Sequence, residues 1–154
     1  MPQQHVETVK RLFAAVRRRD QAGVREAYHP EIVIHESPSL PYGGDYHGHE
    51  EALQHLNGYY RTWDPLRPGV GQPSTPIFLE TTADSVVVLW QEEAIAPGSG
   101  RRIVLPALGV YQVRDGEVVW KPAVDVTRLA KGGQALAALI ALCVTLIAIT
   151  RRSR

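Results

Sequence analysis

The feature that most restricts the fold is a change in the hydrophobic period along the chain. In the first part, apolar side chains recur at helical spacing, and this predicts helices at residues 4–18, 22–28 and 48–60. Later the period falls to two in segments rich in Val, Ile, Leu, Trp and Tyr, which predicts strands at residues 77–81, 85–95, 102–113 and 117–124. Helices followed by a run of antiparallel strands predict an α+β fold, with a cone-shaped curved sheet wrapped around the helices.

One further strand is predicted early in the chain, at residues 32–36, where an apolar run leads into a loop rich in Pro and Gly. The strand ends in two ionisable residues, His35 and Glu36. The loop then brings Tyr42, Asp45, Tyr46 and His47 back toward the same region. Loops held on a rigid scaffold often carry functional sites, so this loop is a candidate site. The alternative is a polar surface loop with solvated histidines.

Alternation along the strand places His35 and Glu36 on opposite faces, so only one of them can point into the cone. We predict that His35 does. Imidazole titrates in the range where proton transfer is useful, and it tolerates partial burial better than an unpaired carboxylate. The alternative is that His35 lies at the rim.

Composition limits the possible functions. The 154 residues suffice for one domain with a proper core, and the net charge of +1 provides no overall electrostatic footprint for nucleic acid. A single cysteine, Cys143, excludes an internal disulfide and a cysteine-based metal cluster. Residues 1–20 are amphipathic and lack the apolar centre of a secretory signal, so we expect a cytoplasmic protein.

The end of the chain has a different character. Residues 135–150 contain no charged side chain and are followed by a basic end, Arg151 to Arg154. As a helix this segment spans ~24 Å, slightly less than a bilayer core. It is either a tail attached to the inner face of the membrane or a helix buried against this protein or a second copy. We therefore expect an α+β domain at 1–131 and an apolar helix within 132–154.

Several stretches, in their order along residues 4–131, resemble a known superfamily. They are the opening helix followed by Arg19-Asp20, Val33-Ile34-His35-Glu36 leading into Leu40-Pro41-Tyr42-Gly43-Gly44, Tyr46-His47-Gly48 before a helix, the hairpin Val113-Arg114-Asp115-Gly116-Glu117-Val118, and Val124-Asp125-Val126-Thr127-Arg128-Leu129. The chain resembles the nuclear transport factor 2-like superfamily. Within it, the chain resembles the SnoaL-like branch, which contains polyketide cyclases, ketosteroid isomerases and limonene epoxide hydrolases.

This resemblance implies a cystatin-like α+β barrel with an apolar pocket, commonly dimeric, and an acid or base near the base of the pocket. It also implies that no metal and no organic cofactor take part. The position that matches the family's late-strand carboxylate is Asp125, and the position at the end of the first strand is His35 or Glu36. We therefore expect a homodimer that binds a hydrophobic small molecule.

Asp125 interrupts an apolar strand, so a side chain facing the cone would have a raised proton affinity and could act as a general acid or base. The alternative role is an N-cap for residues 126–130, and both roles can coexist. Trp90 and Glu92 share one face of a strand, and a buried Glu is costly unless it works or pairs. Tyr42 and Tyr46 could donate to an oxyanion or simply pack.

The predicted catalytic residues are therefore Asp125, His35, Glu92 and Tyr42. The predicted substrate-binding residues are Glu36, Tyr46, His47, Tyr59, Trp63, Trp90, Tyr111 and Trp120. Tyr111 and Trp120 are expected to line the pocket or join the core. A metal site built from the loop histidines is not expected, because no thiolate accompanies them.

We predict an enzyme of small-molecule metabolism, acting on a polyketide-like substrate by acid/base-assisted cyclisation, isomerisation or dehydration. Epoxide opening is an alternative that needs a second carboxylate, for which Glu36 or Glu92 could serve. A second alternative is a non-catalytic module that holds a ligand in the cone or a partner on the sheet.

Overall fold

The computed structural model describes residues 2–67, 75–81 and 84–121. The chain divides into two compact units, Met1–Val124 and Asp125–Arg154, and every described residue belongs to the first. Asp125, the predicted domain boundary at 131 and the apolar segment 135–150 lie outside the described residues. Among the helices within the described ranges, none is long and apolar enough to cross a membrane.

The three predicted helices are confirmed as α1 (Pro2–Arg18), α2 (Gln21–Ala27) and α3 (Gly48–Trp63), and a short 3-10 helix, η1 (Asp64–Leu66), follows α3. The turn between α1 and α2 is set by Asp20, whose carboxylate accepts a hydrogen bond of 2.9 Å from the backbone N–H of Gly23 and caps α2. Two arginines in the last turn of α1 complement the helix dipole.

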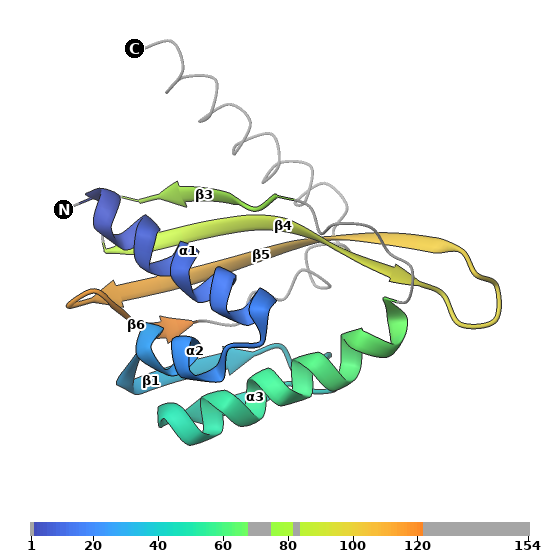
Figure 1. The fold of residues 1–154 in the computed structure, drawn as a ribbon, viewed down its shortest axis with the longest axis horizontal. Coiled ribbons are helices and arrows are strands. Elements are labelled where there is room, and N and C mark those ends of the chain that lie inside the picture. The colour runs from blue at the N-terminus through green and yellow to red at the C-terminus, as the bar shows by residue number, and fades with distance from the viewer. Residues whose placement is uncertain (1, 68–74, 82–83, 122–154) are drawn as a thin grey trace, which may run out of the picture. The chain divides into compact units, whose positions relative to one another are not determined.

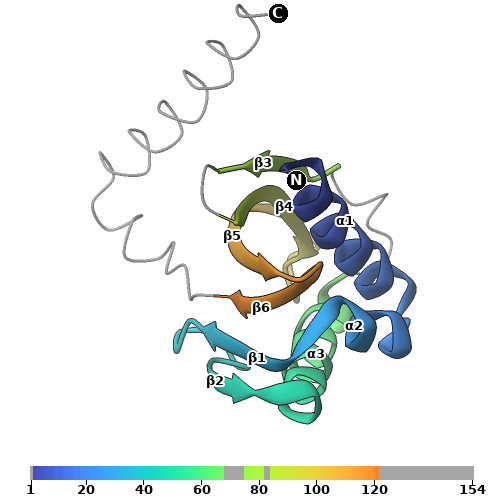
Figure 2. The same ribbon diagram turned by 90° about the vertical axis from the view of Figure 1, so that its left-hand side faces the viewer.

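The strands are β1 (Tyr28–Glu36), β2 (Gly44–His47), β3 (Ile77–Glu80), β4 (Ser85–Ile95), β5 (Arg102–Arg114) and β6 (Glu117–Lys121). They form one sheet in the order β2-β1-β6-β5-β4-β3, antiparallel except for the β1–β6 pair. Figure 1 shows α1 and α3 on the same side of this sheet, and Figure 2 shows the sheet curving around the helices. The predicted α+β architecture with a curved sheet is thereby confirmed.

The sequence analysis predicts a loop after residue 36. The last part of that stretch is instead a strand. Residues 44–47 form β2, which pairs antiparallel with residues 33–36 of β1. Strand β1 also begins at Tyr28, four residues before the predicted start. The sheet therefore extends one strand further than the sequence pattern indicates, with β2 as its edge strand beside β1.

The core lies between the helices and the inner face of the sheet. Val9 and Leu12 of α1 and Ile32 and Ile34 of β1 are almost fully buried. Phe13 of α1 contacts the rings of Phe78, Trp90 and Tyr111 edge-on, with centroids 5.5 to 5.7 Å apart. This packing brings α1 down onto β3, β4 and β5, where apolar burial and aromatic contacts stabilise the sheet's curvature.

A register shift in β6 sets which side chains face inward. Val113 of β5 pairs with Val118, whereas the next residue back, Gln112, pairs with Trp120, so Val119 is an extra residue in β6. A bulge of this kind turns the following side chains over. As a result Trp120 lies on the outer face, 38% exposed, and Lys121 points inward.

Two glycines allow close approaches that a Cβ atom would prevent. A Cβ on Gly58 of α3 would lie 2.7 Å from Cβ of Tyr42, and a Cβ on Gly109 of β5 would lie 2.8 Å from the ring of Tyr111. The loop after β1 can therefore press Tyr42 onto α3, and Tyr111 can lie flat along its own strand. Both tyrosines belong to the site described next.

Candidate functional site

The inner end of β1 carries a partly buried carboxylate with two basic partners. Glu36 continues the inward alternation of Ile32 and Ile34. Its Oε2 lies 3.0 Å from Nε2 of His55 on α3 and 2.6 Å from Nζ of Lys121 on β6. The three side chains, which we name the Glu36 cluster, are only 9 to 13% exposed.

The electrostatics of the Glu36 cluster define its protonation. Burial by itself would raise the pKa of Glu36, but the hydrogen bond from His55 and the charge of Lys121 outweigh it and lower that pKa to about 2. Burial also lowers the pKa of His55, against the opposing effect of Glu36. At neutral pH the cluster therefore contains an ionised Glu36 beside a neutral His55.

A neutral His55 has one nitrogen to donate and one to accept. Because Nε2 faces the Glu36 carboxylate, the proton belongs on Nε2, and Nδ1 carries the lone pair. Within residues 2–67, 75–81 and 84–121 no group pairs with Nδ1, and no fully buried side-chain nitrogen or oxygen lacks a partner. The lone pair on Nδ1 can therefore act as a base.

Aromatic side chains surround the imidazole. The rings of Tyr42 and Tyr46 meet His55 edge-on, with centroids 5.6 and 5.1 Å away, and Tyr42 also meets Tyr59 at 5.9 Å. The hydroxyl of Tyr46 donates to the backbone oxygen of Tyr42 at 2.9 Å. The Nε1–H of Trp63 donates to the hydroxyl of Tyr42, also at 2.9 Å. These contacts place predicted binding residues around the Glu36 cluster.

A second buried carboxylate lies on β4. Trp90 and Glu92 both point inward, as alternation predicted, and Glu92 is paired rather than free. It accepts hydrogen bonds from Tyr59 at 2.9 Å and from Nε1 of Trp90 at 2.8 Å, and it forms an ion pair with Arg67. With three donors on it, Glu92 has little capacity left to accept a proton or attack a substrate.

The two carboxylates are linked through tyrosines. The hydroxyl of Tyr59 contacts Glu92, while its ring contacts Tyr42, which in turn contacts His55 of the Glu36 cluster. Tyr111 of β5 is 5% exposed. Burial raises the pKa of Tyr111, and the charges of Glu36 and Glu92 raise it further, so it lies within electrostatic range of both. Glu36, Tyr42, Tyr59 and Tyr111 therefore belong to one interior region.

The prediction that His35 rather than Glu36 faces the interior is wrong. His35 points to the outer face, where its Nδ1 lies 2.7 Å from Oδ1 of Asp45 on β2 and its side chain is 38% exposed. The reason is that Glu36 does have partners inside, His55 and Lys121, which remove the cost of burying a carboxylate. The catalytic role predicted for His35 has no interior contact to support it.

Two further predicted binding residues lie away from this interior. Trp120 was expected in the pocket or core, but the bulge in β6 turns it outward, where its ring lies 6.2 Å from that of His35. His47 precedes α3 and is exposed, and its backbone N–H donates to Glu51. The prediction for Trp120 is therefore wrong. His47 lies apart from the other predicted site residues.

The sequence analysis missed three residues of the site: His55, Lys121 and Arg67. A signal existed for His55, because it falls on the apolar face of α3 beside Ala52 and Leu56, and all three are buried. A lone histidine on an apolar helix face needs a partner inside. For Lys121 and Arg67 the sequence holds no such signal, since one is directed inward by a bulge and the other follows η1.

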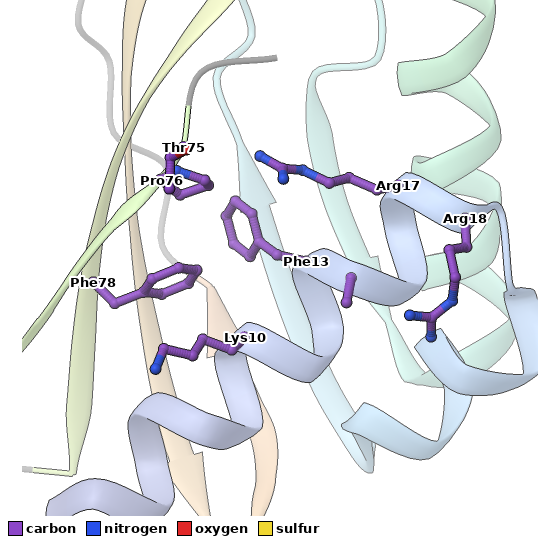
Figure 3. Close-up of a pocket in the computed structure, with 8 residues that line it drawn as sticks. Lys10, Phe13, Arg17, Arg18, Thr75, Pro76 and Phe78 are labelled. Atoms are coloured by element: carbon purple, nitrogen blue, oxygen red, sulfur yellow. The ribbon is translucent and has the colours of Figure 1, made fainter. Parts of the chain in front are cut away.

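Two surface hollows lie outside this interior. The first, of about 390 Å³, lies between α1 and β3, where Figure 3 shows Phe13 and Phe78 together, with Lys10 and Arg17 extending on either side. Its lining contains no His, Asp, Glu or Tyr, so it offers no group for proton transfer at neutral pH. The second, of about 480 Å³, lies against α3 and is bordered by Tyr42 and Tyr46.

Within the described ranges no group of three or more His, Cys, Asp or Glu side chains is placed to hold a metal ion. What the interior offers is a neutral imidazole oriented by an ionised carboxylate, together with buried phenols. This combination is suited to moving protons on a bound organic molecule.

Comparison with known proteins agrees with the fold. Residues 9–121 match the model of the SnoaL-like domain. Among solved structures, a nuclear transport factor 2-like protein of unknown function from Burkholderia pseudomallei is 25% identical, with a TM-score of 0.62 over 77% of this chain and 88% of that one. A candidate polyketide cyclase from Xanthomonas campestris pv. campestris is 15% identical, with a TM-score of 0.61 over 83% and 95% of the two chains.

TerC, co-crystallised with polyporic acid, is 21% identical, with a TM-score of 0.63 over 83% of this chain and 96% of that one. No protein of curated function matches the chain. The matching domain model spans most of the chain and ends at Lys121, so it contains both buried carboxylates. The chain belongs to the SnoaL-like domain family.

Proposed function

We propose that this protein is an acid/base enzyme of small-molecule metabolism. Its substrate is a hydrophobic, polyketide-like molecule bound in the interior, and the reaction is a cyclisation, isomerisation or dehydration. As the family resemblance implies, the chemistry uses side chains alone. The observation that carries the proposal is the Glu36 cluster, in which an oriented, neutral imidazole lies among aromatic rings.

Each member of the Glu36 cluster has a distinct part. His55 is the general base, which takes a proton from the substrate on Nδ1 and can return it at another position. Glu36 is a positioning residue, which fixes the tautomer through Nε2–H and stabilises the imidazolium that forms. Lys121 is also a positioning residue, because its charge keeps Glu36 ionised.

The relatives support this class of function. Two of the structural neighbours are candidate polyketide cyclases, from Xanthomonas campestris and Sinorhizobium meliloti, and another was crystallised with polyporic acid. The proposal for this chain adds to them a specific base, His55.

Epoxide opening is less well supported. It requires a second carboxylate that can attack or activate water, and Glu92 is already bound by Arg67, Tyr59 and Trp90. Glu36 is ionised but engaged by two basic partners. Glu36 also accepts a hydrogen bond from the backbone N–H of Ser37, so three donors hold each carboxylate in place and neither is free to move toward an epoxide or a water.

The test is turnover by full-length protein of candidate polyketide intermediates, followed by mass spectrometry. His55→Gln removes the base and is expected to reduce product formation about a hundredfold or more. His35→Gln is the matched control, because it also removes a histidine bonded to a carboxylate, but on the outer face. We expect its effect to stay within about twofold. Equal turnover by the His55 variant and wild type would refute the proposal.

Asp125, which the sequence analysis predicts to be a general acid or base, stays a prediction. It lies outside the described residues, so the same assay provides its test. If Asp125→Asn lowers turnover while the protein stays folded, the reaction uses two proton-transferring groups. Wild-type turnover by this variant would remove Asp125 from the mechanism and leave His55 as the base.

We also propose a cytoplasmic homodimer. The family resemblance implies a dimer, and the exposed apolar side chains that a contact between copies could cover are Ile77, Val104 and Trp120. Light scattering of the purified chain should give a dimer mass, and a monomer mass would contradict the proposal. Fractionation of full-length protein against a chain ending at Lys131 would show whether residues 135–150 attach it to the membrane.

A further inference from the structure

The hollow between α1 and β3 combines an apolar floor with a positively charged rim. Figure 3 shows the rings of Phe13 and Phe78 together, with Pro76 beside them and the side chains of Lys10 and Arg17 extending on either side. Its volume of about 390 Å³ lies in the lower part of the ~300 to 1,000 Å³ range of small-molecule sites. None of its lining residues belongs to the Glu36 cluster, so the hollow is separate from the candidate functional site.

The charges along the hollow have one sign. Lys10, Arg17 and Arg18 all line it from α1, and of the described residues that line it none is Asp or Glu. Two acidic side chains lie close by, since Glu7 pairs with Lys10 at 2.7 Å and Asp20 pairs with Arg18 at 3.7 Å. Both pairs are exposed, so each contributes little and yields easily to another anion. The hollow therefore favours a ligand with a negative charge.

The floor of the hollow is a preformed apolar surface. Phe13 and Phe78 meet edge-on, with ring centroids 5.5 Å apart, and Phe13 also contacts the rings of Trp90 and Tyr111. These contacts fix the two phenylalanines, yet both remain partly exposed. A hydrocarbon chain bound on them would remove apolar surface from water without any rearrangement of the floor.

We propose that the hollow between α1 and β3 is a binding site for a hydrophobic monocarboxylate, the chemical class of the medium-chain fatty acids. The alkyl chain lies on Phe13 and Phe78, and the carboxylate accepts hydrogen bonds from Lys10 and Arg17. A small inorganic anion would leave the rings uncovered, and a neutral hydrocarbon would leave the cations unused. The site does not rest on the proposed function, because it uses no residue of the Glu36 cluster.

The probe is octanoate, titrated into the full-length protein and followed by NMR of the backbone amides. Octan-1-ol has the same chain without the charge, and acetate has the charged group without the chain. We expect octanoate to bind about fivefold tighter than octan-1-ol, and acetate to bind more weakly than either. The shifted amides should be those of residues 10–18 and 75–80. Equal affinity of octanoate and either comparison ligand, or shifts confined to the Glu36 cluster, would overturn the proposal.

A charge reversal tests the rim. Lys10→Glu should remove the preference for octanoate, a loss of about fivefold, and leave octan-1-ol binding unchanged. Arg25→Glu is the matched control, because it reverses one charge on α2 in a similarly exposed pair, with Glu50 at 2.8 Å. It should bind both ligands as wild type does. Equal losses in the two variants would mean that overall charge attracts octanoate, which would refute the site.

An enlarged side chain tests the hollow itself. Ala14 lines the hollow, so the ring in Ala14→Phe occupies part of the space while every charge is kept. Both octanoate and octan-1-ol should bind about tenfold or more weakly to this variant. Ala22→Phe makes the same change at an exposed position of α2 and should leave both affinities at their wild-type values. Wild-type affinities in Ala14→Phe would contradict the proposal.

The variant of the proposed base keeps the two conclusions apart. His55→Gln should lose turnover and still bind octanoate with wild-type affinity, since His55 does not line the hollow. Loss of octanoate binding in His55→Gln would place the ligand in the interior and overturn the site between α1 and β3. Full turnover by His55→Gln would refute the proposed function and leave this site standing, provided that octanoate still shifts the amides of residues 10–18 and 75–80.

Discussion

Two neighbouring residues of β1, His35 and Glu36, each form a contact between an imidazole and a carboxylate, and the two contacts lie on opposite faces of one sheet. On the outer face, His35 meets Asp45 at 2.7 Å, with the two side chains 38 and 64% exposed. On the inner face, Glu36 meets His55 at 3.0 Å, with side chains 12 and 9% exposed. The shorter contact is the one in water.

The difference shows that burial, not distance, decides what such a pair can do. Exposed pairs contribute ~0 to 1 kcal/mol and are screened by salt. A buried carboxylate must be compensated, and the third member, Lys121, provides a positive charge that the outer pair lacks. In return, the inner imidazole stays neutral beside a permanent negative charge, which is the state that a general base requires.

The inner and outer pairs should differ most in stability when the carboxylate of each pair is replaced by an amide. Glu36→Gln leaves the buried cation of Lys121 without a negative partner, and we expect the free energy of unfolding to fall by about 3 kcal/mol. Asp45→Asn, the matched change on the outer face, should lower it by less than about 0.5 kcal/mol. Urea denaturation of both variants measures the contrast. Equal losses would mean that the Glu36 cluster is no more than a surface pair.

The pH dependence of activity tests whether Lys121 lowers the pKa of His55 in the inner pair. In wild type, kcat/KM should fall with decreasing pH as His55 becomes protonated. The midpoint should lie below the ordinary histidine pKa of 6.5, because burial and the charge of Lys121 lower the pKa of His55. Lys121→Met removes one lowering influence, so the acid limb should move to higher pH.

Arg114→Met provides the control for that shift, since Arg114 belongs to an exposed pair with Glu31 at 3.3 Å. We expect its pH profile to overlay that of wild type. An acid limb that does not move in Lys121→Met, or that moves equally in Arg114→Met, would show that the titrating group is not His55.

Salt provides the smallest expected contrast. Concentrated sodium chloride screens exposed charges far more than buried ones. The stability difference between wild type and Asp45→Asn should therefore vanish at about 1 M salt, while the difference between wild type and Glu36→Gln should change by less than about a fifth. Repeating the urea denaturation at both salt concentrations tests this. A loss of both differences would place Glu36 in contact with bulk water.

Much of the fold could be predicted from hydrophobic period alone, because the helices and the long strands each bury one continuous face. Strand β2 could not, since Gly44 to His47 is short and polar and becomes a strand only by pairing with β1. The sequence also placed Glu92 correctly beside Trp90. Its partner Arg67 depends on the chain path after α3, which local pattern does not specify.

The site itself was only half predictable. Alternation correctly separated His35 from Glu36, but which one faces inward depends on partners 19 and 85 residues further along the chain. Lys121 faces inward only because an extra residue in β6 shifts the register, and such bulges leave no clear mark in alternation. Charge pairing between residues far apart in the chain therefore determines which side chains face the interior, and local propensity does not.

The account's central claim is that His55 is a neutral, oriented base, and the measurement that tests it most directly is nitrogen NMR of the imidazole in wild-type protein. Nitrogen chemical shifts report both the charge and the tautomer of a histidine. We predict a neutral ring at pH 7 with its proton on Nε2 and a titration midpoint below 6.5, the ordinary pKa of histidine. A charged ring at neutral pH, or a proton on Nδ1, would contradict the account.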